Sequence, residues 1–222
     1  MNDITLVIPA KNEAESLPQV LDELKKFDIK KVIVMSKEDI DTFNAIKEYG
    51  EKIIFQKEKG FGNALRTGIN SIDTKYFCVF NADGSFDPND LKNLRQKLED
   101  GSDFVFSSRY IENGGSEDDT VLTYIGNFFF TKICNILFKL SISDVLYTYV
   151  MGSTKGFKTL NMIYNDFSFC VELPIKAKQQ NYILTDFPSF ERSRIAGVKK
   201  VNEFKDGLLI LISILRLLLI KK

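Results

Sequence analysis

Asp83 is the residue whose type and surroundings most clearly indicate chemistry in this chain of 222 residues. It follows an apolar run and precedes Gly84, which places it at the end of an expected β-strand. A carboxylate there can hold a divalent cation that bridges a diphosphate, and Mg²⁺ and Mn²⁺ prefer such oxygen ligands. Asn81 and Ser85 flank Asp83, so the three are the candidate metal ligands. The acids at 87–90 have a structural explanation, because they precede a helical pattern and can cap it.

A second candidate site is the run from Lys59 to Asn63, whose two glycines precede a helical pattern. The amino end of a helix offers free N–H groups and a positive partial charge to a phosphate. Glycine turns before helices are common, so this motif alone is unspecific. In combination with the Asp83 motif it is more informative, and we expect Lys59, Gly60 and Asn63 to take part in nucleotide binding.

Composition limits the chemistry that these residues can perform. The chain has no histidine, so proton transfer and metal binding fall to carboxylates. Thirty basic and thirty acidic side chains cancel, which gives no electrostatic reason to expect a nucleic-acid partner.

Three cysteines, Cys78, Cys134 and Cys170, are odd in number and widely spaced, so we expect reduced, buried thiols. The amino terminus lacks a signal-peptide pattern, and a cytoplasmic location is expected.

These residues need a scaffold, and the chain alternates β-type runs with helical patterns. Runs typical of strands occupy residues 4–8, 31–35, 53–55, 76–80 and 104–107. The alternation predicts an α/β fold with a mainly parallel, Rossmann-like sheet flanked by helices. Loops after the first four strands then converge on one crevice at the carboxyl edge of the sheet. The first of these loops ends in a helix for which Asn12 and Glu15 offer a cap and box.

Residues 121–140 form an apolar stretch in which Lys132 and Lys139 are interspersed. This composition exceeds what an ordinary exposed helix carries. Aromatic runs such as 128–130 more often indicate a core helix, but the two lysines lead us to favour a helix at a membrane surface. The preceding polar stretch, 112–119, has the composition of a mobile loop.

The tail is a second apolar segment, because residues 207–220 are almost wholly apolar and two lysines, Lys221 and Lys222, follow. About 20 residues are needed to cross a bilayer, so this tail suits a helix that lies in the membrane interface. A helix packed on the domain is the alternative. We therefore divide the chain into a domain at 1–202 and a C-terminal apolar helix at 203–222.

Six segments along the chain carry a pattern of motifs: 7–13, 59–68, 81–88, 108–110, 187–188 and 194–200. In this order they resemble the motifs of family 2 glycosyltransferases, and the closest branch is dolichol-phosphate mannose or glucose synthase. Each motif alone is unspecific, but their number and order argue against chance. The resemblance covers most of the chain up to Lys200.

The resemblance implies a GT-A fold that binds a nucleotide diphosphate sugar together with Mg²⁺ or Mn²⁺. The implied catalytic residues are Asp83, which would hold the metal, and Arg109, Arg194 and Lys200, which would bind phosphates of the donor or of a lipid acceptor. The implied nucleotide-binding residues are Pro9, Ala10, Asn12, Glu13, Lys59, Gly60, Asn63, Asn81 and Ala82.

Two positions depart from the family pattern. After its second strand the family usually has Asp-Asp-Gly-Ser, whereas this chain has Ser-Lys-Glu-Asp at 36–39, so the expected base-contacting carboxylate is missing. Asp39 and Asp41 are the candidates to replace it from a shifted loop. Asn81 stands where the family usually has the first aspartate of its Asp-x-Asp motif, which reduces the negative charge offered to the cation.

The expected acceptor follows from a further difference. Many relatives have an acidic doublet late in the domain that serves as general base for a sugar hydroxyl, but this chain has a single acid there, Glu172. Glu172 is equally well explained as a helix cap. A phosphate monoester has a second pKa of about 6 and needs no base near neutral pH. We therefore predict hexose transfer, with inversion, to dolichyl or undecaprenyl phosphate at the cytoplasmic face of a membrane.

Other functions stay open on the sequence alone. One is sugar transfer to a glycan hydroxyl in cell-surface polysaccharide synthesis. Another is a catalytically impaired relative that acts as a membrane scaffold, which the changes at 36–39 and at Asn81 suggest. A nucleotidyltransferase is disfavoured, because its first loop normally contains glycine and residues 9–13 contain none. A membrane partner subunit is compatible with the predicted function.

Overall fold

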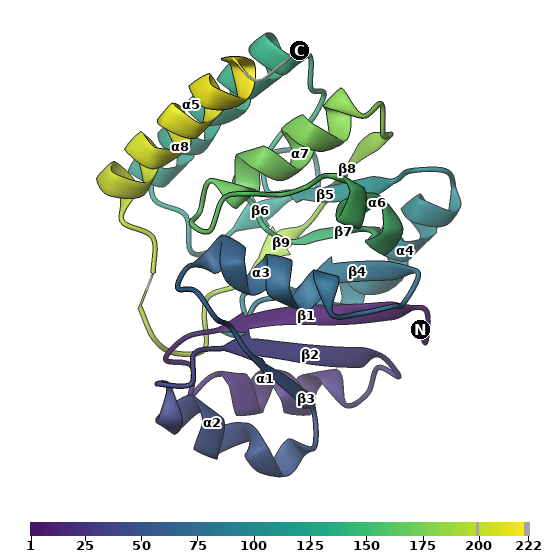
Figure 1. Ribbon diagram of the computed structural model, residues 1–222, viewed down its shortest axis with the longest axis vertical. Coiled ribbons are helices and arrows are strands. Elements are labelled where there is room, and N and C mark those ends of the chain that lie inside the picture. Colours follow the sequence, from purple (N-terminus) through teal and green to yellow (C-terminus); the bar gives the residue numbers. More distant parts are fainter. Residues whose placement is uncertain (199, 220–222) are drawn as a thin grey trace.

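A seven-stranded mixed sheet forms the centre of the molecule, with helices on both faces (Figure 1). The structure is a computed structural model and describes residues 1–198 and 200–219. The strand order is β3-β2-β1-β4-β7-β5-β8, and β7 runs antiparallel to both of its neighbours while all other pairs are parallel. The predicted α/β class with a mainly parallel sheet is confirmed.

The strands of the large sheet are β1 (Ile4–Ala10), β2 (Lys30–Met35), β3 (Lys52–Phe55), β4 (Tyr76–Val79), β5 (Phe104–Ser108), β7 (Val150–Ser153) and β8 (Leu184–Pro188). Two short strands, β6 (Gly115–Ser116) and β9 (Phe190–Glu191), pair in parallel beside it. The α-helices are α1 (Leu17–Leu24), α2 (Ile40–Ile46), α3 (Phe61–Asn70), α4 (Leu91–Glu99), α5 (Val121–Phe138), α6 (Thr154–Thr159), α7 (Phe169–Gln179) and α8 (Glu203–Leu219). Single 3₁₀ turns cover Lys47–Tyr49 and Pro88–Asp90.

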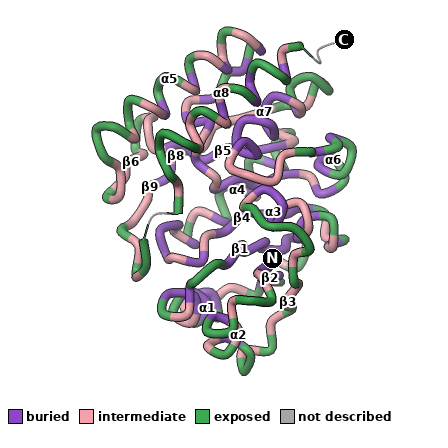
Figure 2. The backbone as a smooth tube through the Cα atoms, turned by 60° about the vertical axis from the view of Figure 1, so that its left-hand side comes forward, coloured by how far each residue is buried: buried purple, intermediate pink, exposed green. Residues whose placement is uncertain are grey.

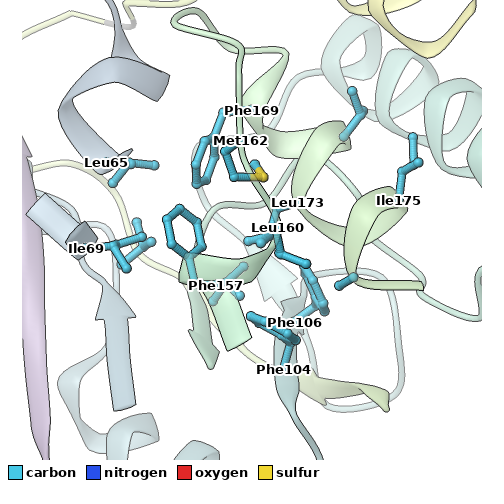
Figure 3. Packing of buried hydrophobic residues seen from close by; sticks show 14 of the residues in the cluster. Leu65, Ile69, Phe104, Phe106, Phe157, Leu160, Met162, Phe169, Leu173 and Ile175 are labelled. Atoms are coloured by element: carbon cyan, nitrogen blue, oxygen red, sulfur yellow. The ribbon is translucent and has the colours of Figure 1, made fainter. Parts of the chain in front are cut away.

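The predicted runs correspond to β1 to β5, whereas two strands of the sheet were not predicted. These are β7, a four-residue strand that contains Gly152 and Ser153, and β8, whose residues are only partly buried. Every residue of β4 and β5 is buried. Strands covered on both faces appear in a sequence as unbroken apolar runs rather than alternating ones, as β4 and the first three residues of β5 do. Figure 3 shows part of the resulting core, in which Leu65 and Ile69 of α3 lie near Phe157 of α6. Gly68 allows α3 to approach the sheet, since a Cβ there would lie 2.4 Å from Val7 Cγ1.

The first helix does not begin as predicted. The sequence predicted a cap at Asn12 with Glu15 as its partner, but α1 starts at Leu17 after Ser16. Asn12 has a φ of +55°, which differs from the conformation of a helix N-cap, and its N–H donates to the carboxylate of Asp39. A contact with the next loop along the sheet therefore determines the conformation of this segment.

Helices α5 and α8 lie side by side along one flank of the molecule (Figure 1). The second half of α8 packs on α5 and α7 through Ile210, Ile214 and Leu217, so the alternative of a helix packed on the domain is correct for that half. Exposed residues follow the outer surface of both helices (Figure 2). Ile220 and the two lysines after it lie outside the described residues.

Candidate active site

Asp83 lies in a tight turn directly after β4. Its Oδ1 accepts a hydrogen bond from the Ser85 N–H at 3.0 Å, and the Asn81 amide donates to Ser85 Oγ at 2.9 Å. Ala82 is buried in the same turn. Gly84 has a φ of +85°, a conformation that residues with a Cβ rarely adopt. The structure therefore brings the three predicted metal ligands together in what we call the Asp83 turn, residues 81–85.

The Asp83 turn fits a cation that substrate and water would largely coordinate. Within the described residues, no hydrogen bond is made to Asp83 Oδ2, so one carboxylate oxygen is available. The same part of the chain contains no group of three or more acidic, cysteine or histidine side chains that could cage a metal. Mg²⁺ is commonly bound through one or two carboxylates, with waters and substrate phosphates as its other ligands.

A segment near the carboxyl terminus, residues 192–198, lies across this turn, and we call it the strap. The Ile195 N–H donates to Asp83 O, and the Arg192 N–H donates to Ser85 O, both at 2.8 Å. These bonds attach the strap to the turn along its backbone.

Packing around Gly84 shows how close the approach is. A Cβ on Gly84 would lie 2.4 Å from Ile195 Cδ1, so a larger residue would displace the strap. The Arg192 guanidinium donates to Gly84 O at 2.9 Å and pairs with Glu23 of α1 at 2.9 Å. Arg192 thus attaches the strap both to the Asp83 turn and to α1.

The two predicted phosphate-binding cations near the strap are each paired with a carboxylate. Arg194 forms an ion pair with Asp118. The hydrogen bond that Arg194 donates to this carboxylate, together with the nearby charge of Asp83, raises the pKa of Arg194. Lys200 Nζ lies 2.7 Å from Glu13 Oε1. Cations therefore stand beside both the Asp83 turn and the loop after β1. Lys199, between them in the matched motif, lies outside the described residues.

A pocket of about 250 Å³ opens between the loop after β1, the amino end of α2 and the strap. Pro9 and Ala10 are the last two residues of β1 and lead into it. Glu13 N–H donates to Thr42 Oγ1 at 2.9 Å, which joins the two loops. The lining residues are Asn12, Glu13, Ala14, Glu15, Ser16, Asp39, Asp41, Thr42, Ala196 and Gly197. Its position fits the predicted nucleotide-binding loop.

Asp39 and Asp41 both line this pocket, but they differ in what they bind. Asp39 caps α2 by accepting from the Thr42 N–H, and its other oxygen accepts from the Asn12 N–H at 2.6 Å. Asp41 is exposed in the first turn of α2, and no described donor bonds to its carboxylate. Of the two proposed replacements for the missing base-contacting acid, Asp41 is the one with free acceptor atoms.

The run from Lys59 to Asn63 has a different neighbourhood from the one predicted. A Cβ on Gly60 would lie 2.1 Å from Asn165 O, and the Asn63 N–H donates to that same oxygen at 3.1 Å. Lys59 is exposed and lies 3.4 Å from Glu38. Close packing on the segment around Asn165 explains the glycines, and the predicted phosphate contact of Lys59, Gly60 and Asn63 stays a prediction.

Arg109 is buried at the end of β5 in contact with two carboxylates. Its Nε and Nη2 bind the two oxygens of Asp144 at 2.7 and 3.1 Å, and its Nη1 lies 3.0 Å from Glu191. Burial lowers the pKa of Arg109, but Asp144 and Glu191 outweigh this and raise it. Removing one partner of a buried ion pair costs about 3–5 kcal/mol. In this arrangement Arg109 does not face a phosphate, and its predicted phosphate contact would require breaking the pair.

Glu172 is neither a helix cap of α7 nor an exposed base. Its side chain is fully buried and accepts the N–H groups of Ile163 and Tyr164 at 2.7 and 3.0 Å, and Lys176 lies 2.7 Å away. Glu172 therefore holds the segment before α7 through these two backbone bonds, and it lies buried in the first turn of α7.

Sequence reasoning missed the residues that hold the cations. Three consecutive residues of the stretch predicted to be a mobile loop make such contacts: Ser116 bonds to Glu191, Glu117 to Ser193 and Asp118 to Arg194. The sequence does contain acidic residues in 112–119 and basic residues in 192–200, which could form ion pairs. Their spacing does not indicate which acid contacts which base.

Residues 5–160 match the family described as glycosyl transferase family 2, and the chain belongs to this family. It is 32% identical over 106 residues to an uncharacterized glycosyltransferase of Mycobacterium tuberculosis, a match that covers 48% of this chain and 48% of that protein. This chain thus spans about half the length of that relative. It is 22% identical over 215 residues to a dolichyl-phosphate hexose transferase of Haloferax volcanii, covering 93% of this chain and 90% of the relative.

Among solved structures, the chain resembles glucosyl-3-phosphoglycerate synthase from Mycobacterium tuberculosis in complex with Mn²⁺, uridine diphosphate and phosphoglyceric acid. The TM-score is 0.77 at 14% identity, over 97% of this chain and 78% of that one. Another crystal of the same synthase contains Mg²⁺ and uridine diphosphate. At this identity the likeness shows the GT-A fold, and the ligands are those of the synthase.

Proposed function

We propose that this glycosyltransferase moves a hexose from a nucleotide diphosphate sugar to a polyprenyl phosphate. The observation that carries the proposal is the junction between the Asp83 turn and the apolar helices. Asp118 contacts Arg194 of the strap, and α5 begins at Val121, only three residues later. A site built in this way can hold a charged diphosphate beside a surface that suits a lipid tail.

Donor binding is supported by the pocket after β1 and by the two cations beside it. We assign the nucleoside to the pocket of about 250 Å³ and the diphosphate to the space between Asp83, Arg194 and Lys200. Mg²⁺ or Mn²⁺ bound at Asp83, with Asn81 and Ser85 as further ligands, would neutralise charge on the diphosphate leaving group. Uridine diphosphate and these metals in the related synthase support a donor of this class.

The residues of this chain then act by position and charge. Asp83 orients the diphosphate, while Arg194 and Lys200 stabilise the negative charge that develops as the bond to the sugar breaks. The acceptor oxygen attacks the anomeric carbon from the opposite side, and a single displacement of this kind inverts the configuration. No side chain of the protein has to accept or donate a proton in this reaction.

A phosphate acceptor is supported by the burial of Glu172. This is the acid that the sequence offers where many relatives have a general base, yet it is fully buried and bonded to two backbone N–H groups. A sugar hydroxyl needs a base, whereas a phosphate monoester is already anionic near neutral pH. The name of the Haloferax volcanii relative, a dolichyl-phosphate hexose transferase, agrees with this choice.

Membrane attachment is supported by the exposed first halves of α5 and α8. Ile125, Phe128 and Phe129 of α5 are 51–59% exposed, and Phe204 and Leu208 of α8 are 82% and 60% exposed. Over the described residues, α5 is the one helix long and apolar enough to span a bilayer, with 22% of it buried. Its second half packs into the domain through Thr131, Cys134 and Phe138, which favours a helix lying on the membrane rather than across it.

Within this proposal the protein works at the cytoplasmic face of a membrane. Its three cysteines are free and buried, as expected of a protein in a reducing compartment.

The proposal is tested by incubating the purified protein and Mn²⁺ with uridine or guanosine diphosphate hexoses and either dolichyl or undecaprenyl phosphate in detergent. Mass spectrometry should detect a glycosyl phospholipid for at least one pair, and none with Asp83→Asn. Product only on a glycan hydroxyl would replace the acceptor assignment. Pyrophosphate release from a nucleoside triphosphate and a sugar phosphate, without any glycolipid, would replace the reaction.

A further inference from the structure

The contacts of Arg109 lead away from solvent and towards the strap. Its side chain is 8% exposed, and its Cζ lies 5.1 Å from the ring centroid of Tyr110 and 4.6 Å from that of Tyr147. Both nitrogens on one edge of the guanidinium bind Asp144, which is fully buried. The remaining nitrogen, Nη1, reaches Glu191. The group is therefore surrounded by protein.

Glu191 connects Arg109 to the Asp83 turn through the backbone. It is the last residue of β9, and its carboxylate also accepts from Ser116 Oγ at 2.6 Å. The strap starts at the next residue, Arg192, whose N–H binds Ser85 O. Three residues further on, the Ile195 N–H binds Asp83 O. A continuous set of contacts thus runs from Arg109 to the backbone of the proposed metal site.

The charges of this cluster argue against a direct phosphate contact. One guanidinium faces two carboxylates, so Asp144, Arg109 and Glu191 together carry a net charge of about −1 when all are ionised. Such a cluster repels a phosphate, and Arg109 would have to leave a bidentate partner to bind one. Arg194, by contrast, is part of the strap, and one partly exposed carboxylate holds it.

We infer that Arg109 is a positioning residue, which acts through Glu191 to hold the strap on the Asp83 turn. This inference rests on the proposed function only in so far as Arg194 and Asp83 act on the donor. The mechanical part of it, the attachment of the strap, does not depend on any ligand.

Hydrogen exchange of the Arg192 and Ile195 amides measures the attachment directly, because these two N–H groups bond to the turn. We would compare the full-length protein with Arg109→Lys and Glu191→Gln. Lysine keeps the charge but lacks the planar guanidinium that binds Asp144 through two nitrogens and Glu191 through the third. Glu191→Gln leaves the Arg109 to Asp144 pair intact in case the first variant folds poorly. Arg95→Lys is the matched control, because Arg95 of α4 also bridges two carboxylates, those of Asp3 and Glu99.

Both test variants should raise exchange at the Arg192 and Ile195 amides by about tenfold or more, while amides of β1 and β2 keep their wild-type rates. Arg95→Lys should leave the strap amides unchanged. Unchanged strap exchange in Glu191→Gln would overturn the inference. So would a loss of protection that is uniform across the sheet, since this indicates a general effect on stability.

Calorimetry with uridine or guanosine diphosphate and Mn²⁺ separates positioning from direct contact. If Arg109 positions the strap, Glu191→Gln weakens nucleotide binding as Arg109→Lys does. If Arg109 contacts phosphate, Glu191→Gln releases it and leaves binding unchanged or tighter, which contradicts the inference. Failure of the wild-type protein to bind either nucleotide contradicts the proposed function, and the exchange data still decide the role of Arg109.

Discussion

Lys200 Nζ lies 2.7 Å from Glu13 Oε1, although 187 positions separate the two residues in the chain. The contact joins the segment after the strap to the loop after β1, beside the nucleotide pocket that Glu13 lines. Either the carboxylate or a bound phosphate can satisfy this lysine. The same choice exists for Arg194, which pairs with Asp118 in this structure.

Lys200→Met should weaken the binding of a nucleoside diphosphate with Mn²⁺ by about tenfold, since it removes a cation from the diphosphate site. Titration calorimetry measures the affinity. Lys158→Met is the control, because Lys158 pairs with Asp73 away from the pocket and its loss should change affinity little. Equal losses in both variants would contradict a specific role for Lys200.

Asp118→Asn should have the opposite effect and strengthen nucleotide binding by about threefold to tenfold. The substitution removes a negative charge near the diphosphate and releases Arg194, while the backbone bonds of the strap remain. The same calorimetric titration checks this prediction. Weaker binding would show that Asp118 orients Arg194 for the substrate instead of competing with it.

The exposed aromatic residues of α5 should govern attachment to lipid. Replacing Phe128 and Phe129 together with serine should lower the partition coefficient onto anionic phospholipid vesicles by about tenfold or more, since burying one such side chain contributes about 1.5–3 kcal/mol. Co-sedimentation measures the bound fraction. Ile183→Ser is the control, because Ile183 is 58% exposed but lies just before β8 and belongs to neither α5 nor α8. Unaltered sedimentation of the double variant would exclude this surface.

Acid should loosen the strap at Ser193. The backbone N–H and the hydroxyl of Ser193 donate to Glu117, and these bonds lower the pKa of Glu117 below its ordinary value of 4.5. Because the folded-state pKa is the lower one, the contribution of this contact is complete above pH 4.5 and is lost as the pH falls through the folded-state pKa. The Ser193 amide resonance should follow this titration in a nuclear magnetic resonance experiment. In Glu117→Gln that titration should vanish.

Part of the fold follows from local sequence signals, because β4 and the first three residues of β5 are buried and apolar throughout. The sequence also predicted where Asp83 lies, since a polar turn directly after a buried parallel strand falls at the carboxyl edge of the sheet. The start of α1 did not follow, because a contact between Asn12 and Asp39, 27 positions apart, decides it.

The partners of the cations could not be predicted for a related reason. Arg194 and Asp118 lie 76 positions apart, and no periodicity in the sequence pairs an acidic loop with one particular basic segment. The sequence also gave no indication that Arg109 is buried. An arginine in a family motif indicates an anion, and here the anions that it contacts are Asp144 and Glu191 of the protein itself.

Metal-dependent nucleotide binding tests the central claim most directly. Calorimetry of uridine and guanosine diphosphate should show at least one of them binding about a hundredfold more tightly with Mn²⁺ than with excess chelator, because the cation links Asp83 to the diphosphate. Asp83→Asn should abolish that difference while the protein keeps its thermal unfolding midpoint. Equal affinity with and without Mn²⁺, or an Asp83→Asn protein that retains the full metal effect, would contradict the account.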